Sequence, residues 1–396
     1  MTPVFRLFLI TSGWTLASYM ASNFLSAWFW DTGTGLVPIV GFYSILFAVM
    51  ILGFGLASKI RSRVKSSWLM AMGILLNAIF LGLLLVLRGS AKPYFVPLAV
   101  LEGLAATFYW LGLYVLASAW VRPDQASWYN GWTGTLEAVL GLVAPPASGW
   151  IIASMAGLAG YHAVFGIAFF SLITCLILIL GGRNASARQI LQEESFTSPV
   201  LPPDWRPLMW SFWALGLRDG IYYFVPNLLL FILSRSTILL GLFVASEALL
   251  QGILFWALAR FTHPRVQTRS LFLAAAISLS ALAAAFQPLN TWILFALGMV
   301  ISLAYPPFKV ALETSALVSI RASGHNENDL VQLTGIKEVW INSGRVISLL
   351  LVLAAVFTAS HFEIQDFRWI LAGWGLVPTV ILITYRSSRK RATHPS

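Results

Sequence analysis

Residues 333–346 read LTGIKEVWINSGRV and place three charged side chains, Lys337, Glu338 and Arg345, inside an apolar stretch at 330–359. A charged residue at the centre of a membrane helix costs about 2.5 to 3.5 kcal/mol, whereas each Leu, Ile or Val returns only about 0.3 to 0.6 kcal/mol. The stretch is long enough to cross a bilayer as a helix. Because of these charges, lipid cannot surround the helix on every side, and we expect at least one of its faces to line a polar interior.

A related stretch occurs in the first half of the chain, where WTGTLEAV begins at Trp132. Aligned with LTGIKEVW from Leu333, it repeats a threonine, a glycine and a glutamate at an offset of 201 residues. This offset lies near half the chain length, so the pattern predicts a duplicated unit. Glu137 and Glu338 are then equivalent residues of the two halves.

The overall composition is typical of an integral membrane protein. Of the 396 residues, 58% are hydrophobic and 10% charged, and the mean hydropathy is +0.80, which is more apolar surface than a soluble core buries. The net charge of +10 is mostly an orientation signal, because 17 of the 25 Lys and Arg residues fall on one set of alternating loops. Basic loops stay cytoplasmic, so both termini are predicted to be cytoplasmic, and we expect a lipid bilayer and no nucleic acid as partner.

Apolar runs separated by charged or Pro/Gly-rich stretches predict twelve transmembrane helices. Their expected ranges are 7–30, 35–58, 67–87, 94–120, 130–154, 160–182, 207–233, 237–259, 270–287, 291–316, 330–359 and 368–385. The longest polar connection divides them six and six. We therefore expect an N-terminal six-helix bundle at 1–182, a cytoplasmic linker at 183–205 and a C-terminal six-helix bundle at 206–396, in a monomeric multi-pass protein of the cytoplasmic membrane.

Charged residues inside the predicted helices follow a pattern. The helices at 67–87, 160–182, 270–287 and 368–385 carry none in their interiors, so we expect these four to face lipid while the others surround a polar path. The candidates for a substrate or proton pathway are Glu102, Arg218, Asp219, Tyr222, Glu247, Gln251, Asn342 and Arg345. The candidates for a cytoplasmic gate are Glu137, Lys309, Glu313, Lys337 and Glu338. Purely structural ion pairs, such as one between Lys309 and Glu313, remain an alternative for these residues.

Signatures of catalysis are missing from the sequence. The five histidines fall at helix ends or in loops without a ligand pair at helical spacing, and neither a GxGxxG loop nor a Walker-type glycine loop is present. We expect no enzyme activity, no resident metal and no cofactor. Without a nucleotide-binding loop, any active transport would draw on an ion gradient.

The two six-helix halves, cytoplasmic termini and long central loop together resemble the major facilitator superfamily over essentially the whole chain. GLVAPPASGW at 141–150 resembles the antiporter motif of that family and keeps Gly141, Pro146 and Gly149, with Pro145 and Trp150 in place of two glycines. The resemblance implies alternating access and favours proton-coupled export of a small organic or amphiphilic molecule. A proton-coupled importer of an anionic metabolite or nutrient in the same fold stays open, as does a non-transporting membrane enzyme or lipid-handling protein.

Overall fold

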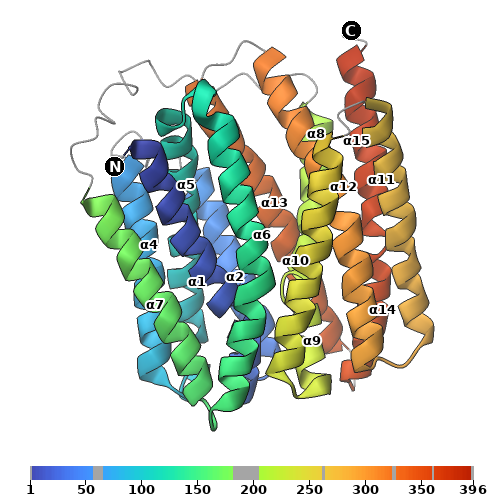
Figure 1. Ribbon diagram of the computed structural model, residues 1–396. Helices are drawn as coiled ribbons and strands as arrows, with labels where there is room; N and C mark the ends of the chain where they lie inside the picture. Colours follow the sequence, from blue (N-terminus) through green and yellow to red (C-terminus); the bar gives the residue numbers. More distant parts are fainter. Residues whose placement is uncertain are drawn as a thin grey trace. The chain divides into compact units, whose positions relative to one another are not determined.

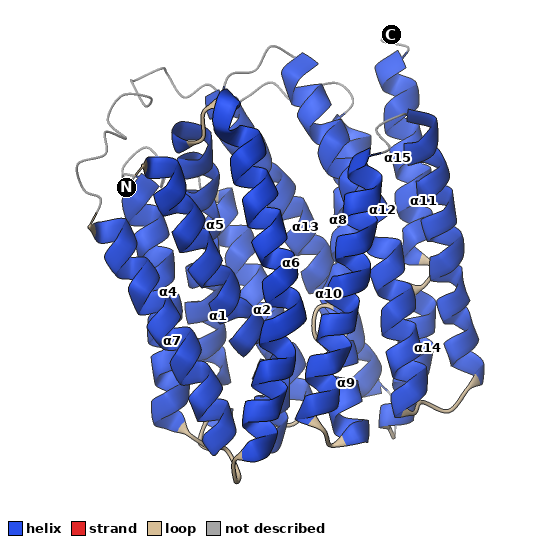
Figure 2. Ribbon diagram, viewed as in Figure 1, coloured by secondary structure: helices blue, strands red, loops and turns tan. Residues whose placement is uncertain are grey.

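The computed structural model describes residues 2–56, 66–181, 205–260, 264–322, 327–358 and 361–393. Helices account for nearly all of these residues, and no strand occurs among them (Figure 2). The chain groups into two compact units. Unit 1 comprises Met1–Pro199 and Glu327–Val339, and unit 2 comprises Val200–Asn326 and Trp340–Ser396. The predicted linker lies outside the described residues, apart from its last residue, Trp205.

Among the residues that the structure describes, unit 1 contains six α-helices of the first half of the chain (Figure 1). These are α1 (Pro3–Asp31), α2 (Leu36–Gly55), α4 (Ser66–Leu87), α5 (Phe95–Trp120), α6 (Pro123–Ser154) and α7 (Ala159–Leu180), with the short 3-10 helix η1 (Lys92–Tyr94). Helix α1 packs on α6 and α7, while α5 packs on α2 and α4. The start of α1 is set by Thr2, whose hydroxyl accepts a hydrogen bond from the backbone N–H of Phe5, and by Pro3 in the first turn.

Unit 2 contains the helices of the second half. These are α8 (Trp205–Tyr222), α9 (Val225–Ser234), α10 (Thr237–Arg260), α11 (Pro264–Leu279), η2 (Ser280–Phe286), α12 (Thr291–Ala322), the part of α13 (Glu327–Thr358) from Trp340 onward, η3 (Ile364–Asp366), α14 (Phe367–Trp374) and α15 (Val377–Thr393). Helix α8 packs on α15, and α12 packs on α10 and α11.

Three of the helices expected in the second half are interrupted. The sequence predicts one helix over 207–233, but the structure has α8 and α9 with a break at residues 223–224. Pro226 lies at the second position of α9 and has no N–H to donate to the carbonyl of Tyr222, which explains the break. The helix expected at 270–287 ends in the 3-10 turn η2, and the one expected at 368–385 divides into α14 and α15.

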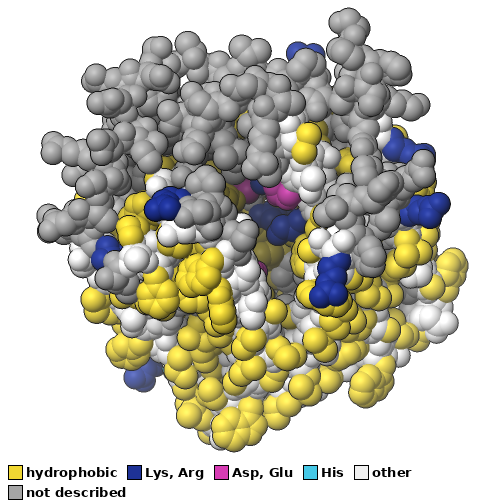
Figure 3. Space-filling model, turned by 45° about the horizontal axis from the view of Figure 1, so that its top comes forward, with side chains coloured by type: hydrophobic (Ala, Val, Ile, Leu, Met, Phe, Trp, Pro, Cys, Tyr) yellow, Lys and Arg dark blue, Asp and Glu magenta, His cyan; other side chains and the backbone are white. Residues whose placement is uncertain are grey.

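The outer surface suits a bilayer. Nine described helical spans are long and apolar enough to cross one, and hydrophobic side chains cover much of the described surface on the face in Figure 3. On α4, the exposed large side chains recur at intervals of three or four residues and form one stripe. They are Trp68, Met72, Leu75, Ile79, Leu83 and Val86. This stripe agrees with the lipid-facing role expected for residues 67–87.

Glycines allow the helices of unit 1 to approach closely. A Cβ atom added to Gly73 of α4 would overlap the backbone of Tyr109 on α5, and one added to Gly112 of α5 would lie 2.5 Å from the backbone nitrogen of Met70 on α4. Association of helices in lipid depends on such close backbone packing. The helices α4 and α5 are therefore closely packed, and they carry the polar residues Asn77 and Glu102.

Candidate functional site

The charged dipeptide Arg218–Asp219 lies near the end of α8, one turn before the break that precedes α9. Two glycines flank it, Gly216 and Gly220, and both lie directly against the backbone of α13. A Cβ on Gly216 would overlap the carbonyl of Ile341, and one on Gly220 would lie 2.6 Å from the carbonyl oxygen of Arg345. The sequence GLRDG thus lets α8 approach α13 and brings Asp219 beside Arg345.

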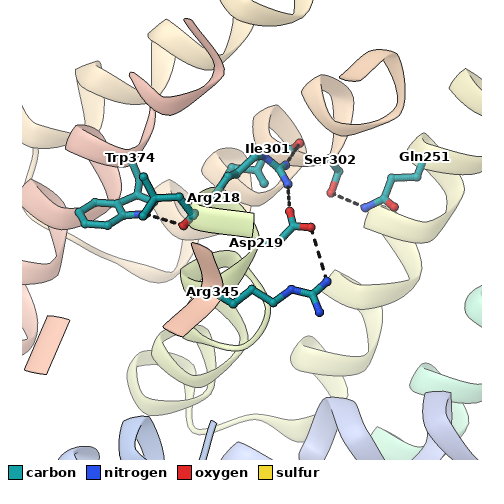
Figure 4. A network of polar contacts seen from close by, with 8 residues as sticks. Arg218, Asp219, Gln251, Ile301, Ser302, Arg345 and Trp374 are labelled. Carbon is teal, nitrogen blue, oxygen red and sulfur yellow. Dashed lines mark hydrogen bonds and ion pairs between the residues drawn. The ribbon is translucent and has the colours of Figure 1, made fainter. Parts of the chain in front are cut away.

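Arg218 is held on several sides. Its Nη1 donates to Oδ1 of Asp219 at 2.8 Å, and its Nη2 donates to the backbone carbonyl of Ile301 on α12 at 2.9 Å (Figure 4). Its guanidinium carbon lies 5.2 Å from the ring centroid of Tyr222 and 5.0 Å from that of Tyr305. The residue is 4% exposed. Charge-assisted hydrogen bonds and two aromatic faces therefore fix this guanidinium in place.

Arg345 lies farther from Asp219. Its Nη2 lies 3.8 Å from Oδ2 of Asp219, on the side opposite Arg218 (Figure 4), and its Nη1 donates to Oδ1 of Asn342 at 3.1 Å. Its side chain is 20% exposed, compared with 5% for Arg218 and 13% for Asp219. One carboxylate thus lies between two guanidiniums, with a short contact to the buried one and a longer contact to the more accessible one.

The remaining members of this cluster come from α10 and α12. Gln251 donates to the hydroxyl of Ser302 at 3.3 Å (Figure 4). Glu247 precedes Gln251 by one turn, and its Oε1 lies 3.1 Å from the position of an added Cβ on Gly298 of α12. The Nζ of Lys309 lies 5.4 Å from the ring centroid of Tyr305, the ring that also faces Arg218. Unit 2 therefore gathers its embedded charges around α8, α10, α12 and α13.

Most of the residues predicted for a polar pathway meet in this cluster. The direct contacts join Arg218, Asp219, Tyr222, Asn342 and Arg345. Sequence reasoning missed two supports: the carbonyl of Ile301, and Trp374, whose indole N–H donates to the carbonyl of Leu217 at 2.9 Å. A backbone carbonyl has no sequence signal, but Trp374 stands between two glycines in the sequence GWG at 373–375, a pattern that could have marked it.

Glu102 belongs to unit 1, whereas the charged cluster described above belongs to unit 2. Its Oε2 accepts a hydrogen bond of 2.7 Å from Nδ2 of Asn77 on α4. Asn77 was missed as a site residue because its helix carries no charge, although an asparagine in an apolar helix is itself a signal. A small cavity adjoins the pair, and its lining comprises Ala17, Ser18, Ala21, Ser22, Leu25, Asn77, Phe80, Leu81, Glu102 and Phe165. The cavity leaves about 10 Å³ for the centre of a water molecule, which is roughly enough space for one water.

The residues predicted for a gate have separate surroundings. Glu338, which belongs to unit 1, accepts a hydrogen bond of 3.1 Å from the hydroxyl of Tyr114 on α5 and lies 4.0 Å from Nζ of Lys337. Its repeat equivalent, Glu137, is exposed on α6. Glu313 lies one turn after Lys309 on α12. A gating role for these five residues stays a prediction.

The antiporter-like stretch lies within one helix. Helix α6 continues through Pro145 and Pro146, and Gly141 and Gly149 are buried.

Within the described ranges, no group of three or more His, Cys, Asp or Glu side chains is arranged to hold a metal ion.

These features define the class: an all-helical, multi-pass membrane protein with charged side chains enclosed in its second half. Solved structures share the fold. A bacterial homologue of the iron transporter ferroportin in an outward-facing state has a TM-score of 0.66 at 16% identity, covering 99% of this chain and 100% of that one. The inward-facing state has a TM-score of 0.65 at 17% identity, covering 98% and 99%. A structure described as a bacterial metal transporter has a TM-score of 0.64 at 15% identity, covering 99% of both chains.

These likenesses confirm the expected fold, while the count of twelve membrane crossings, the cytoplasmic termini and the likeness to drug antiporters stay predictions.

Two relatives are similar in sequence. An uncharacterized protein, YqgE, of Bacillus subtilis (strain 168) is 23% identical over 88% of this chain and 82% of its own length. An uncharacterized protein in the sodM 3' region of Geobacillus stearothermophilus is 28% identical over 41% of this chain and 75% of its own length. No family model matches the chain.

Proposed function

We propose that the chain is a secondary active transporter that moves a small solute by alternating access. The observation that carries the proposal is the Arg218–Asp219–Arg345 cluster, which lies beside the break between α8 and α9. Embedded ionisable residues are expensive and mark transport pathways, and interrupted helices form the binding sites of secondary transporters. The fold supports the same function, because it resembles transporters solved in both outward-facing and inward-facing states.

Proton coupling is the second part of the proposal. Glu102 is an embedded carboxyl with a short hydrogen bond to Asn77 and a cavity large enough for a water molecule. Such a group can exchange a proton with solvent without a charged partner. The proposed direction is export, and it rests on the resemblance of residues 141–150 to an antiporter motif.

A divalent metal ion is the second candidate substrate. It is favoured by the names of the solved structures, which describe iron and metal transporters. Against it stands the donor set, since the described residues offer no group of three metal-binding side chains. We therefore rank a small organic solute first.

The test uses proteoliposomes that enclose a pH-sensitive dye. A gradient of hippurate, an organic anion that crosses bilayers slowly, or of Mn²⁺ is imposed, and proton movement and solute flux are followed together. Wild-type protein is expected to couple solute flux to proton movement. Glu102→Gln is expected to keep solute exchange and lose more than about 90% of the coupled proton movement, because glutamine keeps the shape and hydrogen bonding but carries no exchangeable proton.

Asp31→Asn is the matched control, because it removes an exposed carboxyl of the same unit, at the end of α1, that also accepts a side-chain hydrogen bond, here from the hydroxyl of Tyr161 at 2.9 Å. If this control and Glu102→Gln reduce coupling equally, Glu102 has no special role. If neither solute moves in wild-type vesicles and neither gradient drives protons, transport of these two substrate classes is contradicted.

A further inference from the structure

We propose that Arg345 binds the carboxylate of an organic anion and that Asp219 occupies the same guanidinium when no anion is bound. The inference names a substrate class for the transporter proposed above and rests on that proposal for its biological meaning. Its physical content is a binding site within unit 2, formed by α8 and α13.

The two arginines differ in how closely each contacts Asp219. This difference indicates which of them can exchange Asp219 for a ligand. Arg218 is buried, makes hydrogen bonds of 2.8 and 2.9 Å and has a tyrosine ring on two sides. The contact of Arg345 with Asp219 is 3.8 Å long, and its side chain is four times as exposed. A ligand can therefore displace Asp219 from Arg345 at small cost while Arg218 keeps Asp219 in place.

The charges at this site favour an anion over a cation. Asp219 already faces guanidiniums on both oxygens, which makes it a poor ligand for a metal ion. Arg218 and Arg345 both contact the carboxylate of Asp219, so two guanidiniums share this one acidic group. Because Asp219 is itself a carboxylate, its contacts show that this group fits between the two guanidiniums.

Aromatic side chains near the cluster favour an anion with an apolar body. The rings of Tyr222 and Tyr305 flank Arg218. On α8 and α13, Trp210 makes edge contacts with Trp213 at 5.6 Å and with Trp340 at 5.1 Å between ring centroids. Trp210 is 50% exposed. An aromatic carboxylate such as hippurate matches both the charge and these surfaces.

The experiment measures binding by titration calorimetry on the full-length protein in lipid nanodiscs, with hippurate, its neutral carboxamide, inorganic phosphate and Mn²⁺ as probes. Wild-type protein is expected to bind hippurate and not the carboxamide. Arg345→Gln is expected to weaken hippurate binding roughly 10- to 100-fold, the value of a charged hydrogen bond. Arg345→Lys is expected to recover part of that loss, since it restores the charge without the planar fork.

Asp219→Asn is the more decisive variant, because its affinity for hippurate is expected to increase. Removing the competing carboxylate is expected to tighten hippurate binding roughly three- to fivefold, in line with the value of a partly exposed ion pair. If Asp219 had only a structural role, Asp219→Asn would weaken or abolish the binding of hippurate. Gel filtration of each variant shows whether it is folded, and Arg345→Lys keeps the test decisive if Asp219→Asn does not fold.

Other outcomes overturn the inference. They are equal binding of hippurate and its carboxamide, tighter binding of phosphate than of hippurate, unchanged affinity in Arg345→Gln, or binding of Mn²⁺ that Asp219→Asn abolishes. The inference and the proposed function fail separately. Protein that binds hippurate but moves no solute in vesicles loses only the transport function, and protein that transports Mn²⁺ without binding hippurate loses only the anion site.

Discussion

Arg218→Gln is expected to lower the free energy of unfolding by about 3 to 5 kcal/mol, the cost of breaking a buried ion pair by removing one partner. The change deprives Asp219 of its 2.8 Å contact and leaves the carbonyl of Ile301 without its 2.9 Å donor. Arg345→Gln is expected to cost only about 1 kcal/mol, because its contact with Asp219 is longer and partly exposed. Denaturant unfolding in detergent, followed by tryptophan fluorescence, measures both.

Arg260→Gln is the matched control for these two variants. Arg260 is exposed at the end of α10, where its guanidinium carbon lies 4.1 Å from the ring centroid of Trp256. An exposed cation–π contact is worth about 0.5 to 1 kcal/mol. If all three substitutions cost the same, the distinction between an anchoring and an exchangeable arginine is wrong.

Asp219→Asn is expected to make the stability of the protein depend on a bound anion. The variant leaves two guanidiniums close together without the carboxylate between them, so its melting temperature should fall. Hippurate supplies a carboxylate in the same place. At about 100 times its dissociation constant it should add about 2.7 kcal/mol, and at any fixed concentration it should stabilise the variant more than the wild type.

Glu247→Gln separates this effect from a general response to lost negative charge. It removes another embedded carboxyl of unit 2, on α10, that does not lie between the two arginines. Its melting temperature should respond to hippurate as the wild type does. A larger response in Glu247→Gln than in Asp219→Asn would place the anion elsewhere in the unit.

Much of the helical framework was accessible from sequence, because apolar runs and breaks in them are local properties. The helix expected at 67–87 is α4 (Ser66–Leu87), and its exposed stripe recurs with helical spacing. The break after Tyr222 was not predicted, although Pro226 marks it, since membrane helices often tolerate proline without interruption. The part of α13 up to Val339 groups with unit 1, a result of tertiary contacts that hydropathy cannot report.

The candidate site was only partly accessible. Embedded charges such as Asp219 and Arg345 are conspicuous in an apolar sequence, so they could be selected as candidates. Their pairing depends on the close approach of α8 and α13 at Gly216 and Gly344, which residue types alone do not specify. The partner of Glu102 escaped for a similar reason: Asn77 lies 25 residues earlier on a neighbouring helix.

The proposed transport cycle requires the two units to open alternately to the two sides of the membrane. Its most direct test is electron–electron double resonance on spin-labelled cysteine pairs in a Cys175→Ser background, since Cys175 is the only native cysteine. One pair, at Ser90 and Gln287, reports the predicted outer side, and the other, at Gly131 and Val318, reports the predicted cytoplasmic side. All four residues are exposed, with one of each pair in each unit.

Two distance populations are expected for each pair, because secondary transporters exchange between two states of similar free energy. A change of pH or the addition of hippurate should lengthen the distance at one side and shorten it at the other. A single population at both sides that neither condition changes, or distances that move in the same direction at both sides, would contradict alternating access.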